Sequence, residues 1–211
     1  MFSREYECPS CGAPVKQSQP GSKTLVCTYC SQASHINADS LQAVGEKHPL
    51  IDYGSIFSIG ATGRIGSLSD REFQVLGRVR IDYEDGFWDE WYITFLDDGS
   101  TAWIQEDDGG FTYFKNEGNV SRFPLDRVQV GTYNQIVSNW KPVFVTSKSK
   151  ASINGGEGEL PFKIIPGEKA DFVDGILDGR IISVELLEDD TPLFVGYELD
   201  FDELQLSAAG Y

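Results

Sequence analysis

The stretch FQVLGRVRIDY, residues 73–83, has the two-residue period of a β-strand. Its odd-numbered positions from Phe73 to Tyr83 are apolar except for Gly77, whereas Gln74 and Arg78 are among the polar residues between them. Successive side chains of a strand point to opposite faces, so the pattern predicts one apolar and one polar face. Gly77 interrupts the apolar series and marks a candidate β-bulge.

The same period recurs in LFVGYELDF, residues 193–201. Further strand-like runs cover residues 91–96, 102–105, 111–114, 143–146, 160–165 and 180–187. Turns rich in Asp and Gly separate the runs, and residues 154–158 (NGGEG) are also interpreted as a loop. No window has convincing helical spacing, so the sequence predicts a mainly β chain folded as an antiparallel sandwich or barrel.

Two of these segments resemble each other. Residues 91–104 (WYITFLDDGSTAWI) align without gaps onto residues 182–195 (ISVELLEDDTPLFV), with similar residues at half of the positions. The match predicts two related β units packed face to face. The alternative is that any two hairpins with acidic turns look alike. Equal hairpin registers would favour the repeat, and different registers would exclude it.

The four cysteines of the chain form two C-x-x-C pairs near its start, Cys8 with Cys11 and Cys27 with Cys30. Two such pairs at this separation are typical of a tetrahedral thiolate site that holds a structural Zn²⁺. Because protein ligands fill all four positions, we expect no open coordination site for a substrate. Iron in a rubredoxin-like site and a pair of disulfides remain as alternatives.

These features divide the chain into three parts. Residues 1–37 form the expected zinc ribbon, residues 38–50 a linker with at most a turn or two of helix after Ser40, and residues 51–211 a β-rich body. The body is long enough to bury a hydrophobic core without covalent or metal cross-links.

The charge of the chain restricts its partners. The formal net charge is −16, and the ribbon carries +1 of it, which leaves −17 on the rest. Phosphate backbones and anionic membrane surfaces would repel such a body, so we expect no nucleic-acid partner. No run of 18 apolar residues is present, and we expect no direct membrane insertion. A protein with a basic face, a cationic amine or a divalent metal is the expected kind of partner. The alternative is that the charge forms only a solvated, solubilising surface.

The body lacks the sequence signs of an enzyme. Both histidines, His35 and His48, precede it, and it contains no nucleophile elbow, P-loop or zinc-protease motif. Carboxylates are abundant, but most of them occupy turns, where Asp is favoured for local hydrogen bonding. We therefore predict a protein that is not an enzyme.

Aromatic and acidic residues gather in one segment of the body. Trp88 and Trp91 flank Asp89 and Glu90. Exposed together, these side chains would suit an amine or a Lys- and Arg-rich partner through cation–π contacts and ion pairs. They are the predicted partner-binding residues. The alternative is that the tryptophans fill the core of a β domain.

Several motifs of the body resemble a known bacterial family. They are Gly60–Tyr83, the Trp88-x-x-Trp91-Tyr92 cluster with Trp103-Ile104, the segment 155–162 (GGEGELPF), and the closing segment 194–206. Together they are similar to the family known as domain of unknown function 4178, whose members commonly begin with a zinc ribbon. The resemblance covers roughly residues 50–207 and implies an accessory role, without an established activity.

The leading hypothesis from the sequence is a non-enzymatic adaptor that binds a protein partner through its acidic, aromatic β domain. The alternative is a β barrel that binds a small cationic amine. Grouped thiols suit a reducing compartment, and the N-terminus has no signal-peptide pattern, so we expect a cytoplasmic protein.

Overall fold

The structure is a computed structural model that describes residues 2–207. All strand pairs are antiparallel, and the helices within this range are three short 3-10 turns at Gly66–Leu68, Leu125–Arg127 and Phe201–Glu203. The predicted mainly β fold is confirmed. No helix in the described part of the chain is long and apolar enough to cross a membrane.

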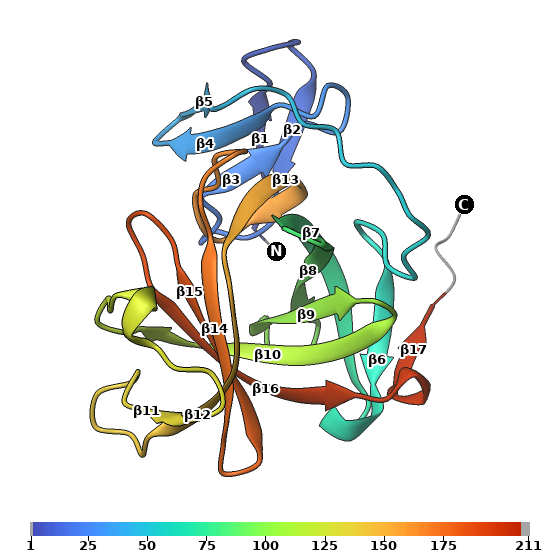
Figure 1. Cartoon of the computed structure of the whole chain (residues 1–211). Coiled ribbons are helices and arrows are strands. Elements are labelled where there is room, and N and C mark those ends of the chain that lie inside the picture. Colours follow the sequence, from blue (N-terminus) through green and yellow to red (C-terminus); the bar gives the residue numbers. More distant parts are fainter. Residues whose placement is uncertain (1, 208–211) are drawn as a thin grey trace.

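The N-terminal strands form a small group that lies to one side of the body (Figure 1). They are β1 (Arg4–Glu7), β2 (Pro14–Gln17), β3 (Thr24–Val26), β4 (Ala33–Asn37) and β5 (Ser40–Ala43). The strands of the body are β6 (Thr62–Ile65), β7 (Arg71–Tyr83), β8 (Gly86–Phe95), β9 (Thr101–Asp107), β10 (Gly110–Asn119), β11 (Tyr133–Asn134), β12 (Val143–Ser149), β13 (Ala151–Leu160), β14 (Asp171–Leu177), β15 (Arg180–Leu186), β16 (Pro192–Leu199) and β17 (Leu204–Leu206).

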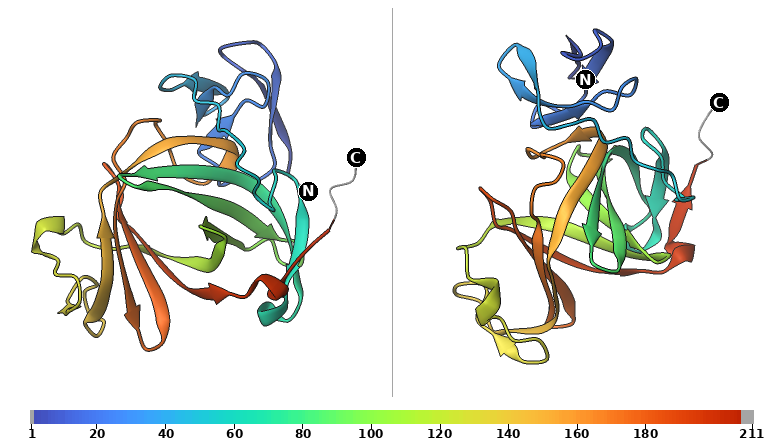
Figure 2. Two further views of the ribbon diagram at one scale, coloured as in Figure 1. Left: turned by 45° about the vertical axis from the view of Figure 1, so that its right-hand side comes forward. Right: turned by 45° about the horizontal axis from the view of Figure 1, so that its top comes forward.

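The body sheet closes on itself. Its strand order is β12-β14-β15-β16-β10-β9-β8-β7-β13. Only Lys150 separates β12 from β13, so the two form one long bent strand that pairs with β14 at one end and with β7 at the other. Hydrogen bonds between residues 151–153 and 167–170 complete the seam. The result is an antiparallel barrel, visible in both views of Figure 2.

The buried apolar side chains of the body form three clusters, one inside the closed sheet and two outside it. One fills the barrel interior with side chains from β7, β8, β9, β10, β13, β14, β15 and β16. A second lies outside the wall formed by β7 to β10, under Phe57 and the β6–β17 pair. A third lies outside β12, β14, β15 and β16, under residues 120–140. The strands are thus buried on both faces over much of their length, unlike those of a simple two-faced sheet.

The expected bulge near Gly77 is present, because the pairing of β7 with β8 shifts between Val75 and Gly77. The bulge has a consequence that the sequence pattern did not predict. Phe73 and Val75 pack in the outer cluster, whereas Val79 and later apolar residues pack inside the barrel. The prediction of a single apolar face along residues 73–83 is therefore wrong, because the extra residue moves the apolar series to the opposite face.

Two predictions about the segment around β13 are also wrong. Residues 154–158 lie within β13 instead of a loop, and residues 161–165 lie beyond its end instead of in a strand. Glycines let β13 approach β7 closely: a Cβ at Gly158 would lie 2.2 Å from the carbonyl oxygen of Leu76, and one at Gly77 would lie 2.3 Å from that of Glu159. Glycine in β13 therefore marks close strand packing.

The two similar segments form equivalent hairpins, β8–β9 and β15–β16. In the first, Trp91 faces Ile104 and Ile93 faces Ala102. In the second, the aligned residues Ile182 and Val184 face Val195 and Leu193. The registers are equal, as the repeat requires. The hairpins lie on either side of β10 in one sheet, so the two related units are parts of a single barrel.

The N-terminal group continues the body sheet, because β3 pairs with the end of β13. Glu159 reinforces this junction by accepting hydrogen bonds from both the backbone and side chain of Ser18, from the backbone of Gln19 and from the hydroxyl of Ser22. Residues 40–43 extend the group as β5, which pairs with β4, so the helical turn expected after Ser40 is wrong.

Candidate functional site: a thiolate cluster and an acidic barrel pocket

The four cysteines lie on two equivalent turns. Cys8 and Cys11 lie between β1 and β2, and Cys27 and Cys30 between β3 and β4. Each turn closes through a backbone hydrogen bond of 2.9 Å back to its first cysteine, donated by Gly12 in one turn and by residue 31 in the other. Gly12 has φ +73°, as expected from a glycine directly after a C-x-x-C pair.

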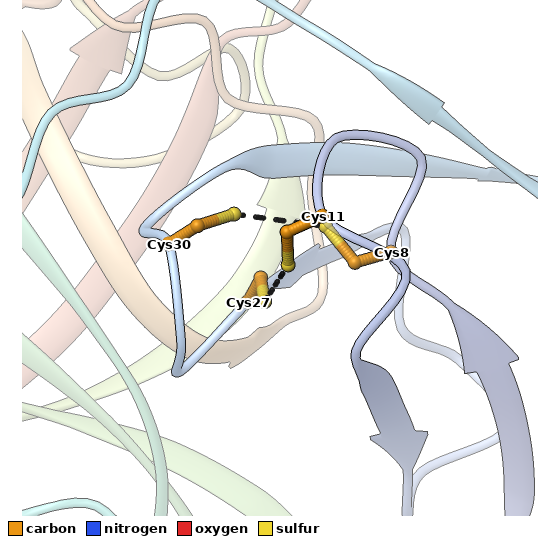
Figure 3. A group of neighbouring side chains, drawn as sticks. All are labelled: Cys8, Cys11, Cys27 and Cys30. Carbon is orange, nitrogen blue, oxygen red and sulfur yellow. Dashed lines mark hydrogen bonds between the residues drawn. The ribbon is translucent and has the colours of Figure 1, made fainter.

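The sulfur atoms point toward one another, as Figure 3 shows, and all four lie within 4.8 Å. The Sγ atoms of Cys8 and Cys30 are 3.7 Å apart, as are those of Cys11 and Cys27. A tetrahedron with metal–sulfur bonds of about 2.3 Å has edges of about 3.8 Å. The cluster therefore fits a tetrahedral metal ion. It does not fit disulfides, whose sulfurs are about 2.05 Å apart.

The predicted partner-binding residues are not on the surface. The exposed fractions are 7% for Trp88, 4% for Asp89, 9% for Glu90 and 1% for Trp91. The prediction of an exposed patch is wrong, because both faces of β8 are covered. Trp88 and Glu90 point into the barrel, where the Trp88 indole donates a hydrogen bond of 2.9 Å to the Glu90 carboxylate.

The other two predicted residues lie on the outer face of β8, where Trp91 belongs to the outer cluster. Trp91 packs against Phe57, and its indole donates to Glu106. Asp89 accepts hydrogen bonds of 2.6 to 2.9 Å from the buried guanidinium groups of Arg78 and Arg80. The residues thus serve the packing of the barrel wall, which is the alternative considered for the tryptophans.

A pocket of about 220 Å³ opens where one end of the barrel meets the N-terminal strands. Trp103, Phe162 and Phe194 line it with aromatic rings, and the ring centroids of Trp103 and Phe162 are 5.6 Å apart. Glu185 of β15 also lines it. Its side chain is only 5% exposed, and the described residues form no hydrogen bond to its carboxyl group. The remaining lining residues include Lys23, Asn116, Asn119 and Asp190.

Glu185 belongs to a group of three acids that face the barrel interior, of which Glu90 and Glu185 are buried and Asp174 is half-buried. Burial raises the pKa of Glu185 well above its ordinary value, and the nearby charges of Glu90 and Asp174 raise it further. Burial raises the pKa of Glu90 to about 7, although the hydrogen bond from Trp88 lowers it. Burial also raises the pKa of Asp174, which accepts a hydrogen bond from Ser147. The described residues provide no salt bridge to any of the three.

This arrangement predicts a pH-dependent stability. A carboxyl group whose pKa is higher in the folded state stabilises the fold below about pH 4.5, and this contribution is lost as the pH rises through about 7. Glu90→Gln should therefore raise the free energy of unfolding at pH 8 by roughly 3 kcal/mol and change it little at pH 4.5. Urea unfolding at the two pH values measures this difference. Glu188→Gln, at an exposed position, is the control, and an equal effect of Glu90→Gln at both values would contradict the prediction.

The sequence analysis missed Glu185 and Asp174. Each occupies a polar position in an alternating strand, which usually indicates the solvent face. The sequence contained one signal. Residues 181–187 read IISVELL, so apolar residues occupy positions on both faces of this segment. A strand that is apolar on both faces is buried on both faces, and an acid within it is then an interior acid.

The fold and the sites define the class of this protein: an antiparallel barrel with a small four-cysteine β module docked on its sheet. The family model described as domain of unknown function (DUF4178) matches residues 61–201, from β6 through β16. The chain belongs to this family, as its motifs indicated. No curated protein and no solved structure matches the chain.

Proposed function

We propose that the barrel pocket binds a small organic amine in its cationic form, with Glu185 as the counter-ion. The observation that supports this most directly is Glu185, a residue that is only 5% exposed, accepts no hydrogen bond from the described residues and lies beside three aromatic rings. A buried carboxylate is costly unless a charge and donors compensate it, and an ammonium group supplies both. The rings add cation–π attraction.

The size and charge of the pocket agree with this ligand class. About 220 Å³ corresponds to roughly seven water molecules, which is room for a small molecule and not for a polypeptide segment. Glu185 and Asp190 outnumber Lys23 among the charged lining residues. Lys23 is exposed at the mouth, where solvent screens its charge.

The N-terminal module is then a structural zinc ribbon. Four thiolates that lie within 4.8 Å of one another, with two of the sulfur–sulfur distances at 3.7 Å, match the soft, tetrahedral shell that zinc prefers. We expect an accessory, non-enzymatic protein of a reducing compartment. The protein partner with a basic face stays a prediction, and it now lacks the surface on which it was based, because Trp88, Asp89, Glu90 and Trp91 are buried.

Butylamine, which is protonated at neutral pH, should bind the protein in isothermal titration calorimetry, whereas 1-butanol, of similar shape and without charge, should not. Glu185→Gln should weaken butylamine binding about 30-fold or more, because loss of one partner of a buried charge pair costs at least about 2 kcal/mol. Binding should also strengthen as the pH rises, since the amine needs the ionised carboxylate.

Glu188→Gln removes an exposed acid of the β15–β16 turn and serves as the matched control, which should bind butylamine like the unmodified protein. Equal binding of butylamine and 1-butanol would exclude a cation site. Undiminished binding by Glu185→Gln would exclude Glu185 as the counter-ion.

A further inference from the structure

One wall of the barrel pocket is held by the N-terminal module. Pro161 and Phe162 form this wall directly after β13 ends. The hydroxyl of Thr24 in β3 donates a hydrogen bond of 2.8 Å to the carbonyl oxygen of Phe162, and the backbone N–H of Lys23 donates one of 2.9 Å to that of Leu160. Thr24 is fully buried, so no water replaces its contact.

The contact continues along the same segment. The ring of His35 in β4 forms a hydrogen bond of 3.0 Å with the carbonyl oxygen of Ile164, and the N–H of Ile164 lies 3.4 Å from the Thr24 hydroxyl. Ile164 is fully buried in the interior cluster of the barrel. Residues 161–164 thus connect the barrel core to β3 and β4, and they carry Phe162 against Trp103.

The positions of β3 and β4 depend on the thiolate cluster. Cys27 follows the last residue of β3, and two residues lie between Cys30 and the start of β4. Within the described residues, the buried apolar side chains of this module are few: Tyr6, Val15, Leu25, Val26 and Ala33, beside Cys8 and Cys27. So small a core does not fold a segment of about 40 residues by itself, and such modules obtain their folding energy from the bound metal.

We propose that metal binding by the four cysteines controls the amine pocket, because the folded ribbon holds Phe162 in the pocket wall and places Lys23 at its mouth. This inference rests on the proposed amine binding. The metal and the amine do not touch, so their coupling runs through β3 and residues 161–164. Linkage then requires the reverse effect as well: the amine should tighten metal binding by the same factor.

The test compares the full chain loaded with zinc and the same chain freed of metal by a chelator that is then removed. Without zinc, butylamine affinity should fall about 10-fold or more, and hydrogen exchange of residues 160–166 should accelerate by a similar factor. Exchange of β12, which packs in the outer cluster under residues 120–140 and lines neither the pocket nor the ribbon junction, should stay unchanged.

Two variants separate this coupling from general unfolding. Thr24→Val keeps the shape of the side chain and the zinc site but removes the hydroxyl, and it should weaken butylamine binding about 5-fold with zinc still bound at one ion per chain. Thr28→Val, at an exposed position between Cys27 and Cys30, should leave the affinity unchanged.

The outcomes are distinct from those of the proposed function. If zinc-loaded protein does not bind butylamine, the proposed function fails, and the exchange of residues 160–166 still decides whether the metal holds the pocket wall. Equal affinity and equal exchange with and without zinc would overturn the coupling while leaving the amine site intact.

Discussion

Cys27→Ser should bind well below one metal ion per chain, whereas the unmodified protein should bind about one zinc ion, and residues 2–44 should lose their fold in the variant. The physical reason is the small core of this module. Apparent binding free energies of about 10–16 kcal/mol couple zinc to folding in comparable modules, so loss of one thiolate removes the main source of stability. The barrel has its own interior cluster and should stay folded.

Metal analysis gives the stoichiometry, and hydrogen exchange resolves the two parts of the chain. Exchange should become fast in β1 to β5 and stay slow in β8 and β9. Thr28→Ser is the matched control, because it changes an exposed, non-coordinating residue between two of the cysteines. A Cys27→Ser protein with one bound zinc and a protected ribbon would show that three cysteines and another group suffice. Loss of protection throughout would show that the barrel depends on the metal as well.

The thiolate cluster could be predicted from sequence because its chemistry is local. Each C-x-x-C turn places two sulfurs on one side of a short loop, and the turn depends on few distant residues. The strands were predictable for a similar reason, since the two-residue period of residues 73–83 and 193–201 reflects local geometry. The equal registers of β8–β9 and β15–β16 followed from the same alternation.

The assignment of faces was not predictable, because it depends on closure of the sheet. Alternation separates two sets of side chains but does not say which set is exposed when segments far along the chain cover the outer face. The segment between β5 and β6, which includes Phe57, covers one outer cluster, and residues 120–140 cover the other. For that reason Glu185, on a polar position, lies inside the barrel, and Asp89 is buried within its wall.

The bulge between Val75 and Gly77 determines which side chains surround Asp89. Without the extra residue, Arg78 and Arg80 would lie on the face opposite to the one they occupy. With it, both guanidinium groups lie on the outer face of the wall, where they form salt bridges with Asp89 of the paired strand β8. In this sequence, two arginines alternate with apolar residues next to a glycine that forms a bulge. Such a pattern is compatible with buried ion pairs as well as with a solvent-exposed face.

Asp89→Asn should lower the free energy of unfolding by about 4 kcal/mol. Arg78 and Arg80 are 4% and 3% exposed, and Asp89 lies between them, with N–O distances of 2.6 Å and 2.8 Å to their terminal nitrogens. The asparagine keeps the size of the side chain but leaves two buried cations with too little negative charge, and removing one partner of a buried pair typically costs about 3–5 kcal/mol. The only other acid within salt-bridge distance of either arginine in the described residues is Glu157, at 3.4 Å from Arg78 and 40% exposed.

Urea unfolding of Asp89→Asn and of Asp85→Asn, an exposed acid in the β7–β8 turn, measures the effect against a matched change of charge. The exposed variant should differ from the unmodified protein by less than about 0.5 kcal/mol. A third variant, Arg80→Met with Asp89→Asn, should recover part of the loss, because it removes one of the two unpaired cations and keeps an apolar contact with Phe87. If Asp89→Asn were no more destabilising than Asp85→Asn, the aspartate would be hydrated, and residues 88–91 would lie at the surface that the sequence alone suggested.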